Sequence, residues 1–326
     1  MMIKSLFKSA FLMGALACAP LFTSCSDDDE GGDGGGVEMY IPASVVDGVR
    51  VSGVSSAADS EHSFSIDYND DGTPASMTVG GQTFDFEYEA ATRAGARAAV
   101  PTGKKLVRIG CRQYNDTLTG DKSSWVATNF AFNTDGFVAS YQEVIEEKFG
   151  SSTEKVVLHL TFDYDNKGRI QRVGIQGTDS GYDDEDGNWQ EHISTSLNYV
   201  YSGDALERAY NTYDGETMSY EYEYDTDAHA NTYNVMTPQL AQGVSVYSPI
   251  LYCLAFSGFM GNASAFLPTK CTYRSYSDYG GEDPDYNDVE VYDITYTFWD
   301  NNKIHTMVST MPTGAKNEYS YTYFDK

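Results

Sequence analysis

The chain has 326 residues, and its 48 Asp and Glu against 21 Lys and Arg give a formal net charge of −27 at pH 7. A surface this acidic repels phosphate backbones, which argues against nucleic acid as a partner. Three cysteines beyond the N-terminal region are too few for a disulfide framework, and whether Cys253 pairs with Cys271 stays open.

The N-terminus has the pattern of a secretory signal peptide. Two lysines precede an apolar run at residues 10–22, which is too short for a membrane-spanning helix. The segment FTSC, which ends at Cys25, resembles the lipobox of bacterial lipoproteins, in which the cysteine is lipidated and becomes the first mature residue. Cys18 is a rival, but cleavage before it would truncate the apolar run. We predict a signal peptide at 1–24 and a lipid such as palmitate on Cys25; a cleaved signal without lipid is the alternative.

An acidic, glycine-rich stretch follows this cysteine. The sequence SDDDEGGDGGG has no apolar residue to bury, so we predict a disordered tether over residues 25–38. An acidic run in this place resembles the signal that sends lipoproteins of Gram-negative gut anaerobes to the outer face of the outer membrane; a periplasmic spacer is the alternative. Because two or more acyl chains anchor a protein stably, we expect the outer membrane as a partner through the lipid, with the domain facing the cell exterior.

Residues 39–326 alternate between strand-like and turn-like segments, which predicts repeated β-hairpins. In the clearest copy, residues 158–176, apolar side chains alternate up to Tyr164, and DNKG at 165–168 turns the chain. Glycine at the last turn position suits a type I turn closed by a left-handed residue. Uneven spacing of the copies indicates a meander in one domain; two domains divided near 90–104 are the alternative. Related copies lie at 64–79, 129–141, 195–210, 218–233 and 292–308.

We predict an all-β fold, a large curved antiparallel sheet of these hairpins, and leave open whether the sheet closes into a barrel. Within MSYEYEYD, residues 218–225, tyrosines alternate with carboxylates, so Tyr220, Tyr222 and Tyr224 share one face. Because other copies alternate in the same way, this is most economically a shared inner face. Each buried tyrosine hydroxyl there needs a hydrogen-bond partner.

One segment without formal charge interrupts the strands. In SPILYCLAFSGFMG, Ser248 is a helix N-cap, Pro249 fits the first helical position and Gly261 is a stop signal, which predicts a helix over about 249–260. This helix is too short to span a membrane and is apolar on all sides, so we expect it to be buried against the tyrosine-rich face of the sheet. A membrane-dipping hairpin is the alternative.

Two of these segments resemble known proteins. YDNKGR, at 164–169, is similar to the YD-type repeats of large bacterial surface and toxin-shell proteins. The lipobox, the acidic tether, the hairpins and GFMGNASAFLPTK, at 258–270, together resemble a family of uncharacterised surface lipoproteins of gut anaerobes, described as domain of unknown function 4595. The resemblance implies a porin-like fold and carries no known activity. It rests on Gly258, Phe259, Gly261, Leu267, Pro268 and Lys270, whereas Ala263 and Ala265 stand where polar residues are expected.

The sequence lacks the common catalytic and metal-binding motifs. It has no nucleophile elbow and no phosphate-binding glycine loop, and its five histidines are scattered. The acidic stretch 178–191 fails as an EF-hand calcium loop, because placing Gly187 at the sixth position leaves Ile193 at the twelfth, where glutamate is needed. We therefore predict no catalytic residue, no metal site and no cofactor, and that the protein is not an enzyme.

Aromatic residues are the remaining candidates for a site. Trp189, Trp125 and Trp299 lie near predicted turns, and tryptophan beside carboxylates is a usual means of gripping a sugar; the alternative is that the rings cap the core. Trp189 is the strongest of the three, because its predicted loop has no apolar neighbours to bury it. We predict a surface-exposed lipoprotein that binds a glycan or other polymer without catalysis. The alternatives are a structural or adhesive envelope component that binds a protein partner and an integral outer-membrane barrel.

Overall fold

The structure, a computed structural model, describes residues 50–57, 63–90, 104–111, 114–115, 122–183, 187–213, 216–225, 229–231, 234, 248–277 and 288–324. All of these residues belong to one compact unit, Val37–Lys326. The predicted signal peptide at 1–24, the tether at 25–38 and the lipidation site Cys25 lie outside the described residues. The division of the chain into signal, tether and domain therefore stays a prediction.

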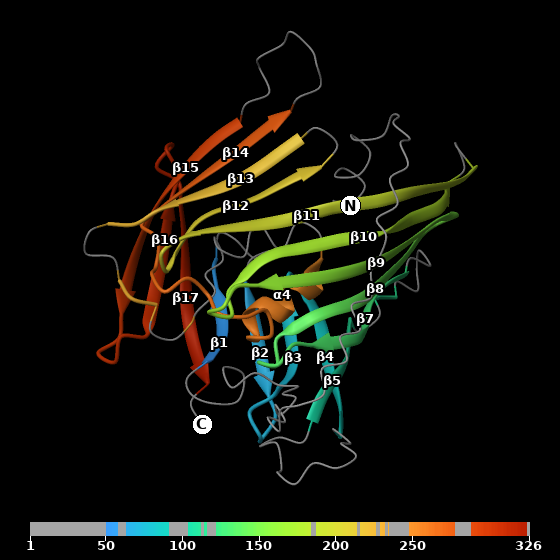
Figure 1. Ribbon diagram of the computed structural model, residues 1–326, viewed down its shortest axis with the longest axis horizontal. Coiled ribbons are helices and arrows are strands. Elements are labelled where there is room, and N and C mark those ends of the chain that lie inside the picture. The colour runs from blue at the N-terminus through green and yellow to red at the C-terminus, as the bar shows by residue number, and fades with distance from the viewer. Residues whose placement is uncertain are drawn as a thin grey trace, which may run out of the picture. The chain divides into compact units, whose positions relative to one another are not determined.

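Antiparallel strands follow one another around the domain in chain order (Figure 1). They are β1 (Arg50–Ser55), β2 (Phe64–Tyr68), β3 (Pro74–Val79), β4 (Gln82–Ala90), β5 (Lys104–Cys111), β6 (Tyr114–Asn115), β7 (Lys122–Phe132), β8 (Val138–Phe149), β9 (Ser152–Tyr164), β10 (Ile170–Asp183), β11 (Gly187–Ser202), β12 (Ala205–Tyr213), β13 (Glu216–Glu223), β14 (Lys270–Ser277), β15 (Asp288–Phe298), β16 (Ile304–Thr310) and β17 (Lys316–Phe324). Because β1 pairs with both β2 and β17, the sheet closes on itself. Strands β5 and β6 both pair with β7 and occupy one place in the ring, which gives a barrel of 16 strands.

This architecture confirms the predicted all-β fold of antiparallel hairpins with one short buried helix. The predicted curved sheet closes into a barrel rather than remaining open. Closure pairs the backbone of the first and last strands, so neither strand is left as an edge with unpaired N–H and C=O groups.

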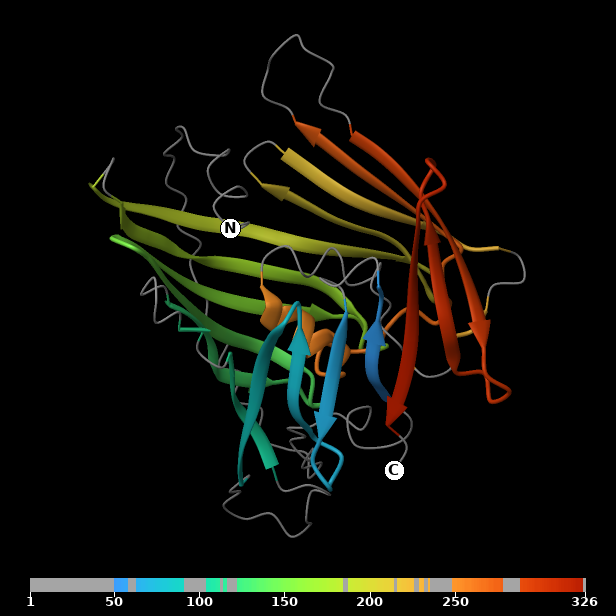
Figure 2. The same ribbon diagram turned by 180° about the vertical axis from the view of Figure 1, so that it is seen from behind.

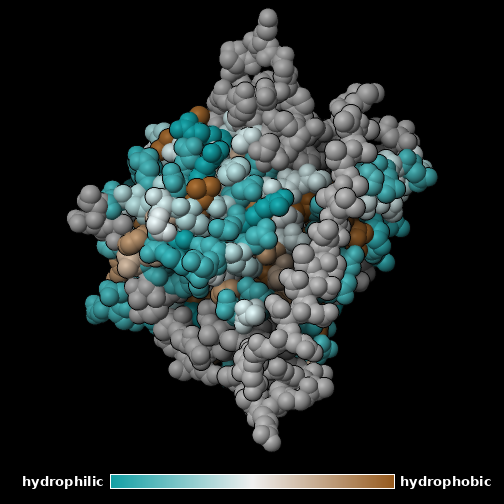
Figure 3. Space-filling model, viewed as in Figure 1, coloured by the Kyte–Doolittle hydropathy of each residue, from teal (hydrophilic) through white to brown (hydrophobic). Residues whose placement is uncertain are grey.

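The two faces of the barrel wall differ in polarity. On β9 the side chains that face inward are apolar and buried: Val156, Leu158, Leu160 and Phe162. The side chains that alternate with them face outward and are mostly exposed and polar: Thr153, Lys155, His159, Thr161 and Asp163. Over the described residues of the visible face, the surface is mainly hydrophilic (Figure 3). The interior of the barrel is therefore the hydrophobic core of the protein.

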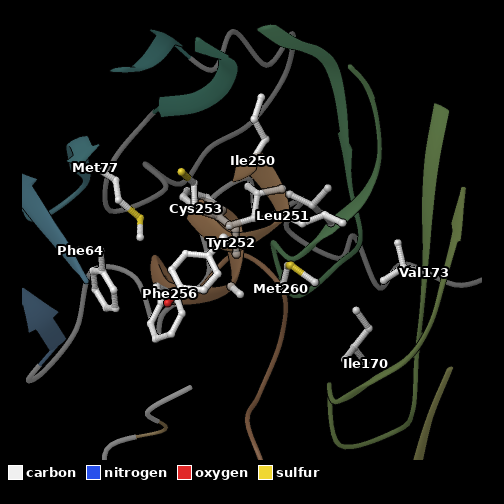
Figure 4. Packing of buried hydrophobic residues seen from close by; sticks show 14 of the residues in the cluster. Phe64, Met77, Ile170, Val173, Ile250, Leu251, Tyr252, Cys253, Phe256 and Met260 are labelled. Carbon is white, nitrogen blue, oxygen red and sulfur yellow. The ribbon is translucent and has the colours of Figure 1, made fainter. Parts of the chain in front are cut away.

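The helix α4 (Pro249–Phe256) lies inside the barrel. Figures 1 and 2, which view the molecule from opposite sides, both place it between β8–β10 and β1–β4. Seven of its eight residues are buried. The rings of Tyr252 and Phe256 lie 5.9 Å and 4.3 Å from the ring of Phe64 on β2, and residues of β10 lie on the other side of the helix (Figure 4). The helix thus fills the lumen and packs against both walls, whereas the sequence predicted that it covers one face of a sheet.

The helix begins as predicted and ends earlier. Ser248 is the N-cap, and its side chain accepts hydrogen bonds from two backbone N–H groups of the first turn. At the other end, Gly258, with φ of 86°, and Phe259 donate their N–H groups to carbonyls of the last turn in a Schellman motif. The helix stops at Phe256 because Gly258, and not the predicted Gly261, supplies the left-handed residue. No helix in the described part of the chain combines the length and hydropathy needed to cross a membrane.

Five of the described hairpin turns share one set of backbone hydrogen bonds. In each, the N–H of the first residue donates to the carbonyl of the fifth, and the N–H of the fourth donates to the carbonyl of the first. The fourth residue has a positive φ in every case and is glycine in all but one, where it is Asn302. This confirms the left-handed closing residue predicted for 165–168. The turns are 69–73, 133–137, 165–169, 299–303 and 311–315.

Six inner tyrosines donate hydrogen bonds to backbone carbonyls, whereas the buried hydroxyl of Tyr199 has no partner among the described residues. In MSYEYEYD, Tyr222 is buried, and the hydroxyl of Tyr224 donates to the carbonyl oxygen of Leu206 at 2.8 Å. The same kind of bond recurs around the barrel: Tyr68 to Val51, Tyr88 to Pro74, Tyr164 to Val138, Tyr296 to Pro268 and Tyr323 to Ile304. Because the protein itself supplies these partners, tyrosine can serve as a core residue on this face.

The segment that follows α4 runs along the turns at one end of the barrel. The N–H of Asn262 donates to the carbonyl of Gly168 in the β9–β10 turn, and the N–H of Ala265 donates to the carbonyl of Asp204 in the β11–β12 turn. The motif GFMGNASAFLPTK thus ties the helix to two hairpins. Cys253 and Cys271 are buried free thiols and do not pair with each other, and Cys111 is buried as well.

Candidate ligand-binding site

The candidate site lies on the inner wall formed by the long strands β8–β11, which project beyond their neighbours in Figure 1. Trp189 belongs to β11, where it alternates in step with the buried residues Leu197 and Tyr199. Because β10 and β11 pair without a register shift, Trp189 faces the inside of the barrel as these two residues do. Its side chain is half-buried.

Strand register places four carboxylates on the same inner wall as Trp189. One row of directly opposed residues across β8, β9, β10 and β11 is Glu147, Glu154, Gly181 and Trp189. The adjacent row on the same face is Ile145, Val156, Asp179 and Glu191. Directly opposed Cβ atoms lie about 5 Å apart, so these side chains are neighbours. We call Glu147, Glu154, Asp179, Glu191 and Trp189 the acidic wall.

The ring of Trp189 lies over Gly181. A Cβ atom added to Gly181 would lie 2.8 Å from Cζ2 of Trp189 and would overlap the carbonyl oxygen of Thr153, so only glycine lets the ring approach the backbone here. A pocket of about 620 Å³ opens at this end of the strands. Its lining includes Glu147, Glu154, Gly181 and Trp189 from the inner face. Outward-facing positions supply most of the other lining residues, among them Lys122, Lys148 and Lys155.

Burial, together with the charges of neighbouring carboxylates, raises the pKa values of Asp179 and Glu147, and burial raises that of Glu191. Asp179 is only 3% exposed, and burial, followed by the charges of Glu154 and Glu191, raises its pKa from 3.8 to about 7. Burial and the charge of Glu154 raise the pKa of Glu147, and burial raises the pKa of Glu191. Asp179, Glu147 and Glu191 therefore hold protons more tightly than ordinary carboxylates do, and a positively charged group beside them would be stabilised.

The three predicted tryptophans occupy different environments. Trp125 lies within β7, is only 6% exposed and stacks on Phe84 with ring centroids 6.0 Å apart, so it belongs to the core, as the alternative interpretation proposes. Trp299 is 50% exposed in the β15–β16 turn, with its ring 3.9 Å from the ring of His305. Trp125 and Trp189 both lie on the inner face of the barrel, and Trp299 lies outside it in a turn.

A second buried carboxylate, Glu143, lies deeper on β8. It is fully buried; the hydroxyl of Ser248 donates to its Oε1 at 2.8 Å, and the hydroxyl of Tyr141 donates to its Oε2 at 3.3 Å. Because Ser248 also caps α4, this network joins the helix N-terminus to the barrel wall. Burial raises the pKa of Glu143 from 4.5 to about 7, although the hydrogen bonds from Ser248 and Tyr141 oppose the rise.

Replacement of Glu143 by Gln is expected to stabilise the protein more at pH 8 than at pH 5. The folded wild type keeps Glu143 protonated up to about pH 7, whereas the unfolded chain releases the proton near 4.5, so the stabilising contribution of the neutral acid is lost as the pH rises through 7. Gln stays neutral, so its advantage in free energy of unfolding should grow by about 2 to 3 kcal/mol between the two pH values.

Urea unfolding at pH 5 and pH 8 measures this difference. Glu146→Gln, which changes an exposed residue of the same strand that pairs with Lys155, is the control and should shift both values by less than about 1 kcal/mol. Parallel pH profiles for wild type and Glu143→Gln would contradict a buried acid that titrates near neutrality.

The sequence pattern singles out Trp189 but predicts a loop over residues 178–191. In the structure β10 continues to Asp183 and β11 begins at Gly187, so most of this stretch is strand. The signal for the acidic wall is present in β10, where Asp179 follows Val173 and Ile175 on the same alternating face. A carboxylate on a face that is otherwise apolar is rarely buried without a reason.

The fold and the site together define a closed antiparallel β-barrel whose lumen holds an apolar core and, along the long strands, an acidic wall with one tryptophan. No family model matches the chain, and no curated protein matches it. The similarity to domain of unknown function 4595 and to YD-type repeats therefore stays a prediction. Among solved structures, a porin-like protein from Bacteroides uniformis is similar, with 13% sequence identity and a TM-score of 0.31 over 67% of this chain and 97% of that chain.

The arrangement of the acidic side chains also bears on metal binding. Among the side chains that the structure describes, no group of three or more His, Cys, Asp or Glu has an arrangement that could hold a metal ion. Side-chain oxygens and an aromatic face are what the acidic wall offers to a ligand. Hydrogen bonding, ring stacking and charge attraction are the interactions that these groups provide.

Proposed function

We propose that this protein is a lipid-anchored protein of the outer membrane that binds a glycan at the acidic wall without catalysis. The observation that carries the proposal is the position of Trp189, which is half-buried over Gly181 at the edge of a pocket of about 620 Å³ with carboxylates beside it. An aromatic ring stacks on the apolar face of a sugar, while carboxylates accept hydrogen bonds from its hydroxyl groups.

The size and lining of the pocket support this class of ligand. Pockets for small ligands measure roughly 300 to 1,000 Å³ and combine apolar surface with a few convergent polar groups. Here Trp189 and Gly181 form the apolar part, and Glu147 and Glu154 supply the acceptors. The pocket opens at the ends of the strands, so a longer polymer could place one or two of its units against the wall.

The polarity of the barrel supports a lipid anchor over the alternative of an integral outer-membrane barrel. A membrane barrel presents an apolar band to lipid and encloses a polar lumen. In this protein the lumen holds α4 and the apolar core, and the outward side chains of β9 are polar except for Val157. Anchoring through Cys25 and orientation toward the cell exterior rest on the sequence of the first 38 residues.

Replacement of Trp189 by Ala is expected to weaken glycan binding at least tenfold, because a stacked aromatic face is lost. A glycan array probed with the full chain in detergent identifies the ligand, and titration of the best hit measures the change. Trp299→Ala, which removes an exposed tryptophan outside the wall, is the control and should leave binding unchanged.

Two results would count against this proposal. Equal binding by wild type and Trp189→Ala would place the glycan elsewhere on the protein. If no glycan binds, the alternative of a structural or adhesive envelope component with a protein partner would be favoured.

A further inference from the structure

The carboxylate of Asp179 is buried and incompletely hydrogen-bonded. It is only 3% exposed, and within the described part of the chain its Oδ1 atom has no hydrogen-bond partner. A buried carboxylate oxygen without a partner costs free energy, and folded proteins rarely retain one. The Oδ1 atom of Asp179 therefore lacks a hydrogen-bond partner that a bound ligand can supply.

The neighbours of Asp179 on the inner face increase this cost. Glu191 lies directly opposite on β11, and Val156 lies directly opposite on β9, beside Glu154. The charges of Glu154 and Glu191 both act on Asp179. On the outer rim, Lys155 pairs with Glu146, so that cation faces away from Asp179. Three carboxylates thus converge on one part of the wall, and no cation of the described residues lowers the pKa of Asp179 or Glu191.

We propose that the acidic wall binds the ammonium group of a cationic saccharide, with Asp179 and Glu191 beside the charge and Trp189 against the sugar ring. This inference rests on the proposed function and names the class of glycan. An ammonium group supplies the donors that Asp179 lacks, and it relieves the repulsion among the carboxylates. An organic cation is also attracted electrostatically to the face of the Trp189 indole ring, whereas a neutral sugar only stacks on it.

The arrangement separates the two parts of such a ligand. Trp189 and Glu154 belong to the row that lines the pocket, and Asp179 and Glu191 belong to the adjacent, more buried row. A sugar ring held against Trp189 can therefore direct an amino substituent toward Asp179. An N-acetyl group at the same position carries no charge and leaves the carboxylates unneutralised.

The test compares two hexasaccharides that differ only in this substituent. One is a hexamer of β-1,4-linked glucosamine, whose ammonium groups carry N–H donors, and the other is its N-acetylated counterpart. Titration of the full chain in detergent at pH 7 should show about tenfold or tighter binding of the cationic hexamer. Because the amines of this hexamer gain charge as the pH falls, a fall in its affinity at pH 5.5 reports protonation of Asp179 on the protein.

Asp179→Asn keeps the shape of the side chain and removes its charge. It should abolish the preference for the cationic hexamer, while Asp163→Asn, which removes an exposed carboxylate from the outer face of β9, should keep it. The unfolding midpoint of Asp179→Asn in denaturant should not fall, because the change removes a buried charge. If Asp179→Asn nevertheless fails to fold, Glu191→Gln is the second variant and should also reduce the preference.

Any one of three results with the hexamers would overturn the inference. They are equal affinity for the two hexamers, an unchanged preference in both wall variants, and binding of neither hexamer. If the N-acetylated hexamer binds as tightly as the cationic one and Trp189→Ala abolishes that binding, the proposed function stands and only the ammonium site is rejected. Tighter binding of calcium ions alone than of the cationic hexamer would also reject it.

Discussion

Replacement of Leu251 by Ala is expected to reduce the free energy of unfolding by about 3 to 5 kcal/mol. Leu251 lies in α4, is fully buried and faces the interior packing shown in Figure 4. The substitution removes most of a side chain from the centre of the barrel, and the surrounding strands are held by their hydrogen bonds and cannot close the cavity. The backbone N–H of Leu251 keeps its hydrogen bond to Ser248, so the loss reports packing and not capping.

Equilibrium unfolding in urea measures this loss. Val289→Ala is the control, because Val289 is 48% exposed on β15 and should change stability by less than about 1 kcal/mol. If Leu251→Ala costs no more than this control, the lumen is not a packed core. A water-filled lumen would tolerate the change, so the experiment also tests whether α4 serves as core or as a loose plug.

Replacement of Gly177 by Ala is expected to destabilise the protein by about 2 to 3 kcal/mol. A Cβ atom at Gly177 would overlap the carbonyl oxygen of Val157 and would lie 3.0 Å from the Cα of Leu158. Both are backbone atoms of the paired strand β9, so the clash is relieved only if the β9–β10 ladder moves. The ladder carries the register that assembles the acidic wall, and the variant should therefore also weaken ligand binding.

Gly174→Ala is a matched control within β10. A Cβ atom there would meet Oγ1 of Thr161 at 2.7 Å, which is the tip of a side chain that can rotate away. The lower conformational entropy of alanine in the unfolded chain favours this substitution by about 0.5 to 1 kcal/mol. Similar stabilities of the two variants in the same urea titration would show that the close approach of β9 and β10 does not constrain residue 177.

The strands, the turns and the start of the helix were predictable because each depends on local chemistry. Alternation of apolar and polar residues predicted the inner face of β9, and the glycine of DNKG predicted the turn at 165–168. Ser248 predicted the first residue of α4 because a side-chain oxygen there satisfies N–H groups that no helix can satisfy internally. The end of the helix was missed because Gly258 and Gly261 are both local stop signals, and both have a positive φ.

The candidate site was only partly predictable. Trp189 stood out because apolar residues are scarce around it, but Trp125 carries the same kind of local signal and is buried against Phe84. Sequence alternation shows which residues of one strand share a face. It does not show which residues of another strand stand opposite, and the pairing of Asp179 with Glu191 depends on that register.

The sequence by itself determined an all-β chain of hairpins with one buried helix, because periodicity, turn residues and caps act over a few neighbouring residues. Only the tertiary structure decided that β1 returns to pair with β17, that α4 fills the closed lumen, and that four carboxylates from four strands lie on the same wall as Trp189. These features join residues that are far apart in the chain. Their geometry follows from strand number, register and closure taken together, which no local pattern specifies.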